Sequence, residues 1–281
     1  GLGDVYKRQM YYKTTESLLA FIKKSPTAFQ ATAEMEKKFA ENGYQFLSER
    51  EHWKLQPGGK YIVTRNHSAL IAFSIPKKEC RKFHIIASHS DSPAFKIKEN
   101  PEIRVENAYT KLNVEGYGGM LMAPWFDRPL SVAGRVVVRR DGSLKEELVN
   151  IDRDLVMIPS LAIHMNREAN KGVSYNPQKD LLPLLGCGDS RPELLNIIAE
   201  ELKVSTEDIL AHDLFLYNRM EGTIWGADRE FVSAPRLDDL QCAFASMEGM
   251  FAGKHEESIA VHCVLDLSLI HISEPTRLAL I

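Results

Sequence analysis

The sequence predicts a mixed α/β protein with an inserted β-rich segment, and three observations support this. An apolar run at 83–89, led in by basic residues and closed by Ser-Pro, is typical of a buried strand whose carboxyl end carries polar residues. A second apolar run at 259–265 follows a helical pattern at 240–251. Between about 97 and 232, short alternating runs are broken by Gly, Pro and Asp-Gly turns, which favours strands.

Composition limits the classes of partner and ligand. The 281 residues are 44% hydrophobic and 26% charged, enough for a sizeable core in one large or two smaller domains. The net charge of -3 and the lack of a basic tract argue against a nucleic-acid partner. We find no long apolar run and no signal-peptide pattern, so we expect a cytoplasmic protein with no membrane partner.

Cysteine usage indicates which ligands a metal site could use. The four cysteines are scattered without a Cys-x-x-Cys pair, so the sequence predicts neither a disulfide framework nor a thiolate zinc site. Any metal would therefore need histidine and carboxylate ligands.

The two ends of the chain are related through the genetic code. Residues 1–9, GLGDVYKRQ, can be written as GGG CTC GGA GAT GTG TAT AAG AGA CAG. The reverse complement of that DNA translates as LSLIHISEP, which is residues 267–275. This relation resembles a transposon-type sequencing adapter and is not expected of two unrelated natural tails. We therefore expect 1–9 and 267–281 to be non-native tails around a natural segment, 10–266, that is truncated at its C-terminus.

Two helices are expected near the start of the chain. Apolar residues within 14–24 have helical spacing, and threonines begin the pattern. A second helix follows, with Ser25 as cap, Pro26 at its first position and Gly43 as terminator. Two strands around a polar turn are expected at 61–63 and 69–73.

The inserted segment is expected to contain one clear helix, at about 192–203. Ser190 and Glu193 have the spacing of a capping box at its start. Another short helix is expected to begin near Ser205.

Single polar residues give weak functional signals. His89 could bind a metal through one ring nitrogen while Asp91, two residues on, fixes the ring through the other. Each candidate also has a structural explanation. Asp238 precedes a helical pattern and could be its N-cap, and both His89 and His164 could be hydrogen-bonded core or loop histidines.

Taken together and in order, several motifs resemble the M18 family of metallo-aminopeptidases, the aspartyl aminopeptidase family. The matching stretches are 25–29, 57–61, 64–66, 89–93, 117–119, 125–131, 158–164 and 235–240. They span nearly all of residues 10–266. Gln30 stands where the family often has histidine, and Asp239 where it often has asparagine; neither change affects an expected ligand.

The resemblance implies an incomplete three-layer, zinc-exopeptidase-like catalytic domain at 10–97 and 233–266, with an inserted β-rich dimerisation domain at 98–232. It also implies a peptide substrate and a homo-oligomer, a dimer or a dodecamer. Two metal ions are expected per site. Zinc is the usual metal of the family, and His and carboxylate ligands also suit cobalt and manganese.

The resemblance also assigns roles to residues. By motif position, His89 ligates one metal ion and Asp238 bridges both, while Asp91 orients His89. His164 is similar to the family histidine that contacts the substrate or intermediate in a partner subunit's active site.

One part of the family pattern is missing. In the family, the strand that ends near Asp266 runs into a Glu-Glu pair, a general base followed by a metal ligand, whereas this chain has Leu267 and Ser268. We therefore predict a full-length aminopeptidase that removes N-terminal residues, acidic ones among them, and an inactive chain as given, with apolar surface left uncovered. The alternative is a non-catalytic scaffold subunit with a peptidase fold. Another co-catalytic zinc exopeptidase family is disfavoured by the long insert.

Overall fold

The computed structural model describes residues 2–106, 108–188 and 192–267, and it divides into two compact units. Unit 1 comprises Gly1–Ser92 with Glu221–Ile281, and unit 2 is Pro93–Met220. The domain limits expected from the sequence, with an insert at 98–232, stay a prediction.

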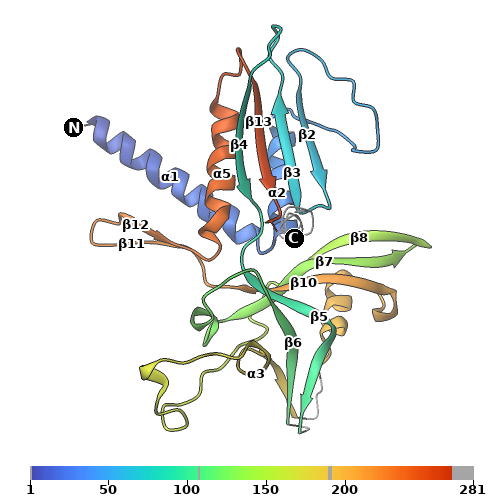
Figure 1. Cartoon of the computed structure of the whole chain (residues 1–281), viewed down its shortest axis with the longest axis vertical. Helices are drawn as coiled ribbons and strands as arrows, with labels where there is room; N and C mark the ends of the chain where they lie inside the picture. The colour runs from blue at the N-terminus through green and yellow to red at the C-terminus, as the bar shows by residue number, and fades with distance from the viewer. Residues whose placement is uncertain (1, 107, 189–191, 268–281) are drawn as a thin grey trace, which may run out of the picture. The chain divides into compact units, whose positions relative to one another are not determined.

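Unit 1 is built on a five-stranded mixed sheet with strand order β1-β2-β3-β13-β4 (Figure 1). Strand β4 pairs in parallel with β13, whereas β13 is antiparallel to β3. The expected strands at 61–63, 69–73, 83–89 and 259–265 are confirmed. The bounds are β1 Gln45–Phe46, β2 Lys60–Arg65, β3 Ala69–Ser74, β4 Phe83–His89 and β13 Ile259–Leu265.

Helices α1 (Leu2–Lys24), α2 (Ala28–Glu41) and α5 (Leu237–Ala252) form one hydrophobic core with this sheet (Figure 1). Their apolar residues recur at helical spacing, so each helix has an apolar side to bury. In β13 the alternate residues Ala260 and Val264 are buried, as period-two alternation requires. Helix residues of this core are Leu18, Phe21, Ile22, Ala31, Met35, Phe39, Leu240, Ala243, Phe244, Met247 and Met250.

Two helix starts differ from expectation. Helix α1 begins at Leu2 rather than near residue 14. Thr15 is an internal residue of this helix and not its cap, since its hydroxyl donates back to the Tyr11 carbonyl at 2.9 Å. Helix α2 begins at Ala28 with Thr27 as N-cap. Ser25 is fully buried and lies in the turn between the two helices.

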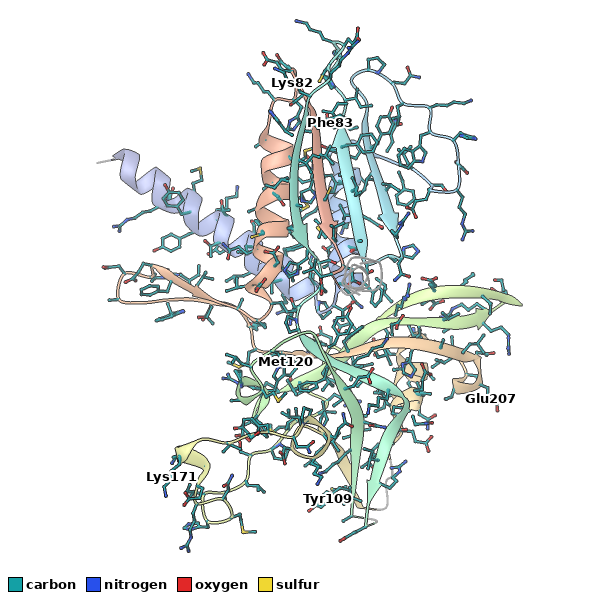
Figure 2. The ribbon with its side chains drawn as sticks, in the orientation of Figure 1. Lys82, Phe83, Tyr109, Met120, Lys171 and Glu207 are labelled. Atoms are coloured by element: carbon teal, nitrogen blue, oxygen red, sulfur yellow. The ribbon has the colours of Figure 1, made fainter. Side chains whose placement is uncertain are left out.

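Strand β4 was expected to be buried, and this is wrong. Phe83 is 60% exposed, Ile85 65% and Ile86 51%. The strand stands last in the sheet order, and in the part of the chain that the structure describes it pairs only with β13. Figure 2 shows Phe83 at the start of this edge strand. The run is apolar, as a buried strand would be, but the described residues leave Phe83, Ile85 and Ile86 exposed to solvent.

Unit 2 contains a six-stranded antiparallel sheet in the order β8-β7-β10-β5-β6-β9. Its buried face carries Val, Leu and Ile at alternate positions, including Val136, Val138, Leu214 and Leu216. The bounds are β5 Ala94–Val105, β6 Tyr109–Tyr117, β7 Leu130–Arg140, β8 Ser143–Asn150, β9 Leu184–Cys187 and β10 Ile209–Asn218.

Gly134 in β7 is required by a close approach between strands. A Cβ at this position would lie 2.0 Å from the Asp213 carbonyl oxygen of β10. Only glycine fits here, since any side chain would push the two paired strands apart.

The helix expected at 192–203 is confirmed as α4 (Leu194–Leu202), with Glu193 as its N-cap. Ser190 lies outside the described residues. The short helix expected near Ser205 is a 3-10 turn, η4 (Thr206–Asp208). The remaining elements are η1 Ala123–Trp125, η2 Ala169–Lys171, α3 Pro177–Asp180, and the hairpin strands β11 Thr223–Trp225 and β12 Phe231–Ser233 in unit 1. None of the described helices is long and apolar enough to cross a membrane.

His262 is a titratable group inside the core of unit 1. Its ring is fully buried, with Nε2 2.8 Å from Ser246 Oγ and 3.3 Å from the Ala243 carbonyl oxygen. Its buried Nδ1 has no hydrogen-bond partner. Burial lowers the pKa of His262 from 6.5 to about 4, so the folded protein keeps the ring neutral at neutral pH.

We predict an acid-sensitive contribution of His262 to stability. Below pH 6.5 the unfolded chain binds a proton at His262 that the folded chain takes up only near pH 4, so stability falls as pH drops through this window. The full contribution is roughly 3 kcal/mol at 1.36 kcal/mol per pKa unit. Urea unfolding at pH 7, 6 and 5 should show a wild-type slope that His262→Gln lacks. The exposed His52→Gln is the control, and a pH-independent difference would contradict the prediction.

We also predict that the exposed face of β4 drives self-association. An edge strand with unpaired backbone groups and exposed apolar side chains is a template for pairing with another chain. Ile85→Lys should increase the monomer fraction in size-exclusion chromatography with light scattering, because a charge on this strand opposes pairing. Leu144→Lys, at a residue that is 67% exposed in unit 2, is the control. Equal effects of the two substitutions would contradict the prediction.

Candidate metal centre

His89 is the last residue of β4 and lies directly opposite Leu265 of β13. The turn that follows is fixed by Ser90, whose backbone N–H donates to the Leu265 carbonyl at 2.9 Å and whose hydroxyl donates to the Ser68 carbonyl at 2.5 Å. The sheet therefore places the imidazole at its carboxyl edge, where open α/β sheets hold their ligands.

The start of α5 brings two carboxylates to the same edge. His89 Nε2 lies 3.3 Å from Asp238 Oδ1 and 3.7 Å from Asp239 Oδ2. Both aspartates have non-helical backbone angles, so regular helix begins at Leu240, as expected from the sequence. One ligand atom from each of the three residues lies within 4.8 Å of the others, and they are the single group of this kind in the described part of the chain.

The other ring nitrogen of His89 faces Asp91. Nδ1 is 3.0 Å from the Asp91 carbonyl oxygen and 3.4 Å from its Oδ1. The Asp91 carboxylate also accepts the Leu267 N–H at 2.9 Å. Burial raises the pKa of the Asp91 carboxyl. The ring is thus held through Nδ1, which leaves Nε2 directed at the two aspartates.

Asp239 is the site residue that sequence reasoning missed, since it was treated as a change that leaves the ligands unaffected. Its Oδ2 accepts the backbone N–H of His89 at 3.1 Å, and its side chain is only 17% exposed. A hydrogen bond to Asp239 raises the pKa of the Cys242 thiol, which keeps that neighbour protonated. Two adjacent carboxylates directly before the helix predicted at 240–251 were the signal that could have found it.

The donor set fits a divalent cation. Two carboxylates and one imidazole give a negatively charged cluster, and nitrogen and oxygen donors of these types bind zinc, cobalt and manganese. The described residues supply three donor groups, which is the protein contribution to one ion of a catalytic zinc site.

His164 belongs to unit 2 and not to this cluster. It is exposed in a turn that follows Ile158. Asp127 shapes the start of this loop by accepting the Ser160 N–H at 2.9 Å, and this bond lowers the pKa of Asp127. The expected role of His164 at a partner's active site stays a prediction.

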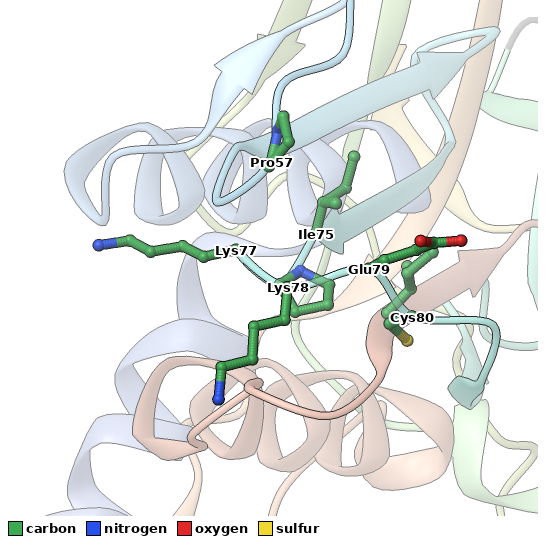
Figure 3. Close-up of a pocket in the computed structure, with 8 residues that line it drawn as sticks. Pro57, Ile75, Lys77, Lys78, Glu79 and Cys80 are labelled. Atoms are coloured by element: carbon green, nitrogen blue, oxygen red, sulfur yellow. The ribbon is translucent and has the colours of Figure 1, made fainter.

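A separate hollow of roughly 300 Å³ lies at the other end of β4. Ile259, one of its lining residues, pairs with Phe83, the first residue of β4, whereas His89 is the last. Figure 3 shows the Lys77 and Lys78 side chains extending in different directions. The hollow therefore lies at the end of β4 opposite to His89 and is not part of the metal centre.

Comparison with known families gives a match over most of the chain. A family model described as "Aminopeptidase I zinc metalloprotease (M18)" matches residues 21–270. A protein of Clostridium novyi named "Probable M18 family aminopeptidase 2" is 46% identical over 246 residues, which are 85% of this chain and 57% of that relative. The chain thus spans little more than half the length of this relative.

Solved structures share the fold. A chain in a cryo-EM structure of the Ape4 and Nbr1 complex superposes with a TM-score of 0.85 at 33% identity, over 90% of this chain and 54% of that one. A chain of the S. cerevisiae mApe1 dodecamer superposes with a TM-score of 0.80 at 25% identity, over 95% and 63%. These likenesses confirm the mixed α/β fold.

We predict that the chain binds one divalent cation at this cluster and that Asp239 strengthens the binding. Asp239→Asn removes a negative charge and should raise the dissociation constant for Co²⁺ about tenfold, as is usual for groups close to a metal's ligands. Competition with a chromophoric chelator measures this constant. Asp141→Asn, in an exposed turn of unit 2, is the control and should bind as wild type does. Unchanged affinity in Asp239→Asn would show that this carboxylate has no part in binding.

Proposed function

Because the chain belongs to the M18 family of zinc metalloproteases, we propose that the whole protein is a metallo-aminopeptidase that removes N-terminal residues from peptides. The observation that carries this proposal is the convergence of His89 with Asp238 at the carboxyl end of β4. These residues lie far apart in the sequence, and both are residues to which the resemblance assigns metal ligation.

Within this proposal, His89 Nε2 and Asp238 would hold a zinc ion, and Asp238 would also serve as a ligand to a second one. The Asp238 side chain is 90% exposed, so its carboxylate has room for a further ligand besides the ion near His89. Zinc in such a site polarises the scissile carbonyl and lowers the pKa of a bound water. Cobalt or manganese could replace it, since the same donors bind them.

Asp91 is a positioning residue in this scheme. When the neutral imidazole donates from Nδ1 to the Asp91 carbonyl, the tautomer is fixed and the Nε2 lone pair is left for the metal. The Asp91 carboxylate beside Nδ1 favours the same orientation.

His164 is proposed to act on the substrate or the tetrahedral intermediate in a partner subunit of a homo-oligomer. The loop that carries it exposes Leu161 by 70% and Met165 by 77%, which suits a segment covered by another subunit. Likeness to a chain of a dodecamer supports assembly, as a dimer or a larger shell.

The remaining features of the proposal rest on the resemblance. They are a preference for acidic N-terminal residues and action in the cytoplasm. We further propose that the 281-residue chain alone is inactive. The described residues supply donor groups for one ion, and no glutamate among them joins that cluster as a general base.

The activity is testable with the chain and with a chimera. The chimera joins residues 10–266 to the part of the Clostridium novyi relative that lies beyond its match to this chain. We expect the chain alone to leave aspartyl, glutamyl and leucyl p-nitroanilides intact, and the chimera to hydrolyse them only with zinc, cobalt or manganese. His89→Ala and Asp238→Asn should each lower turnover by at least a hundredfold, and Asp141→Asn should not.

The same experiment separates the two functional readings. A chimera that folds and binds metal but cleaves none of these substrates would favour the non-catalytic scaffold. Turnover by the purified 281-residue chain would contradict its proposed inactivity.

A further inference from the structure

The loop before the metal centre is tied to the end of α1 by one arginine. Arg236 Nε donates to the Ser25 carbonyl oxygen at 3.0 Å, and Arg236 Nη2 donates to the Ile22 carbonyl oxygen at 3.1 Å. Ser25 is fully buried. Two stretches singled out in the sequence, 25–29 and 235–240, therefore meet in space although about two hundred residues separate them.

The end of a helix is a good receptor for a guanidinium group. Helix α1 ends at Lys24, so the Ile22 carbonyl lies in its last turn, at the negative end of the helix dipole, and it also accepts the Ser25 N–H at 3.1 Å. Ser25 is the first residue beyond the helix. The planar fork of arginine can donate to the Ile22 and Ser25 oxygens at once, whereas the single ammonium of lysine cannot match that geometry.

Arg236 stands two residues before Asp238. Its φ of 59° lies in the left-handed region, which turns the chain just before the two aspartates. From the other side, the Ser92 hydroxyl donates to the Asp238 carbonyl at 2.9 Å. The backbone of Asp238 is thus held by anchors on both sides.

These anchors matter because packing does not hold the Asp238 side chain. With 90% of that side chain exposed, burial does not restrict the carboxylate, whose ion-pair contact is the one with His89 Nε2 at 3.3 Å. Its position relative to His89 must therefore be set by the backbone, and the backbone is set by the hydrogen bonds around it.

We propose that Arg236, bound to the carbonyls at the end of α1, is a positioning residue that places Asp238 for metal binding. This inference rests on the metal site of the proposed function. Arg236 does not touch the site itself; it acts through the backbone of 237–239. Loss of such an outer contact typically weakens metal binding by about 10- to 100-fold.

The first test needs no metal. Hydrogen–deuterium exchange in EDTA should show faster exchange in peptides covering 234–242 for Arg236→Gln and Arg236→Lys, with β2 and β3 unchanged. Arg65→Gln is the matched control, because Arg65 also donates through Nε and Nη2, to Glu49, from β2. Exchange in 234–242 that equals wild type would overturn the proposal. If Arg236→Gln does not fold, Arg236→Lys and Ser92→Ala carry the same test.

The second test measures Co²⁺ affinity by chelator competition and the visible spectrum of the cobalt-saturated protein. We expect both Arg236 variants to bind about 10- to 100-fold more weakly, with a changed spectrum, while Arg65→Gln binds as wild type. Variants that bind as wild type, with lowered melting temperature only, would reduce Arg236 to a structural tie and leave the metal site standing. Faster exchange in the variants of a chain that binds no cobalt would keep the positioning role and reject the metal site.

Discussion

The parallel pairing of β4 with β13 is the interaction on which the candidate centre depends. It aligns His89 with Leu265 at one edge of the sheet, and α5, which leads into β13, starts beside that edge with Asp238 and Asp239. Because β13 lies far along the chain from β4, the candidate ligands come together only when these two strands pair in the sheet. The metal binding proposed for this centre is thus coupled to the long-range order of the sheet.

The charge at this edge favours a bound cation. Asp238 and Asp239 place two carboxylates near one imidazole, and like charges at this separation repel unless a cation or hydrogen bonds compensate them. The backbone N–H of His89 satisfies part of Asp239, while Asp238 faces solvent and keeps its oxygens for a ligand. A carboxylate that is both exposed and held by its backbone suits the proposed metal centre, because its oxygens are open to a ligand while its position is fixed.

The strands of unit 1 are not buried to the same extent. Three helices cover one side of its sheet and bury Ala260 and Val264 of β13, but Phe83 and Ile85 of β4 stay exposed. The curated relative reported above is longer than this chain, which matches 57% of it. The exposed apolar side chains of β4 form a surface that would be stabilised by burial against another polypeptide segment or another molecule.

Sequence alone determined the mixed α/β class, the strands at 83–89 and 259–265, the helix that starts regular geometry at Leu240, and His89 with Asp238 as candidate ligands, because periodicity and motif order are local properties. It could not determine that β4 is an exposed edge or that Arg236 reaches α1. Those facts depend on which distant segments become neighbours. A run of apolar residues indicates that a strand is stabilised by burial. Only the tertiary structure decides which segments pack against that strand and which polar groups meet at its carboxyl end.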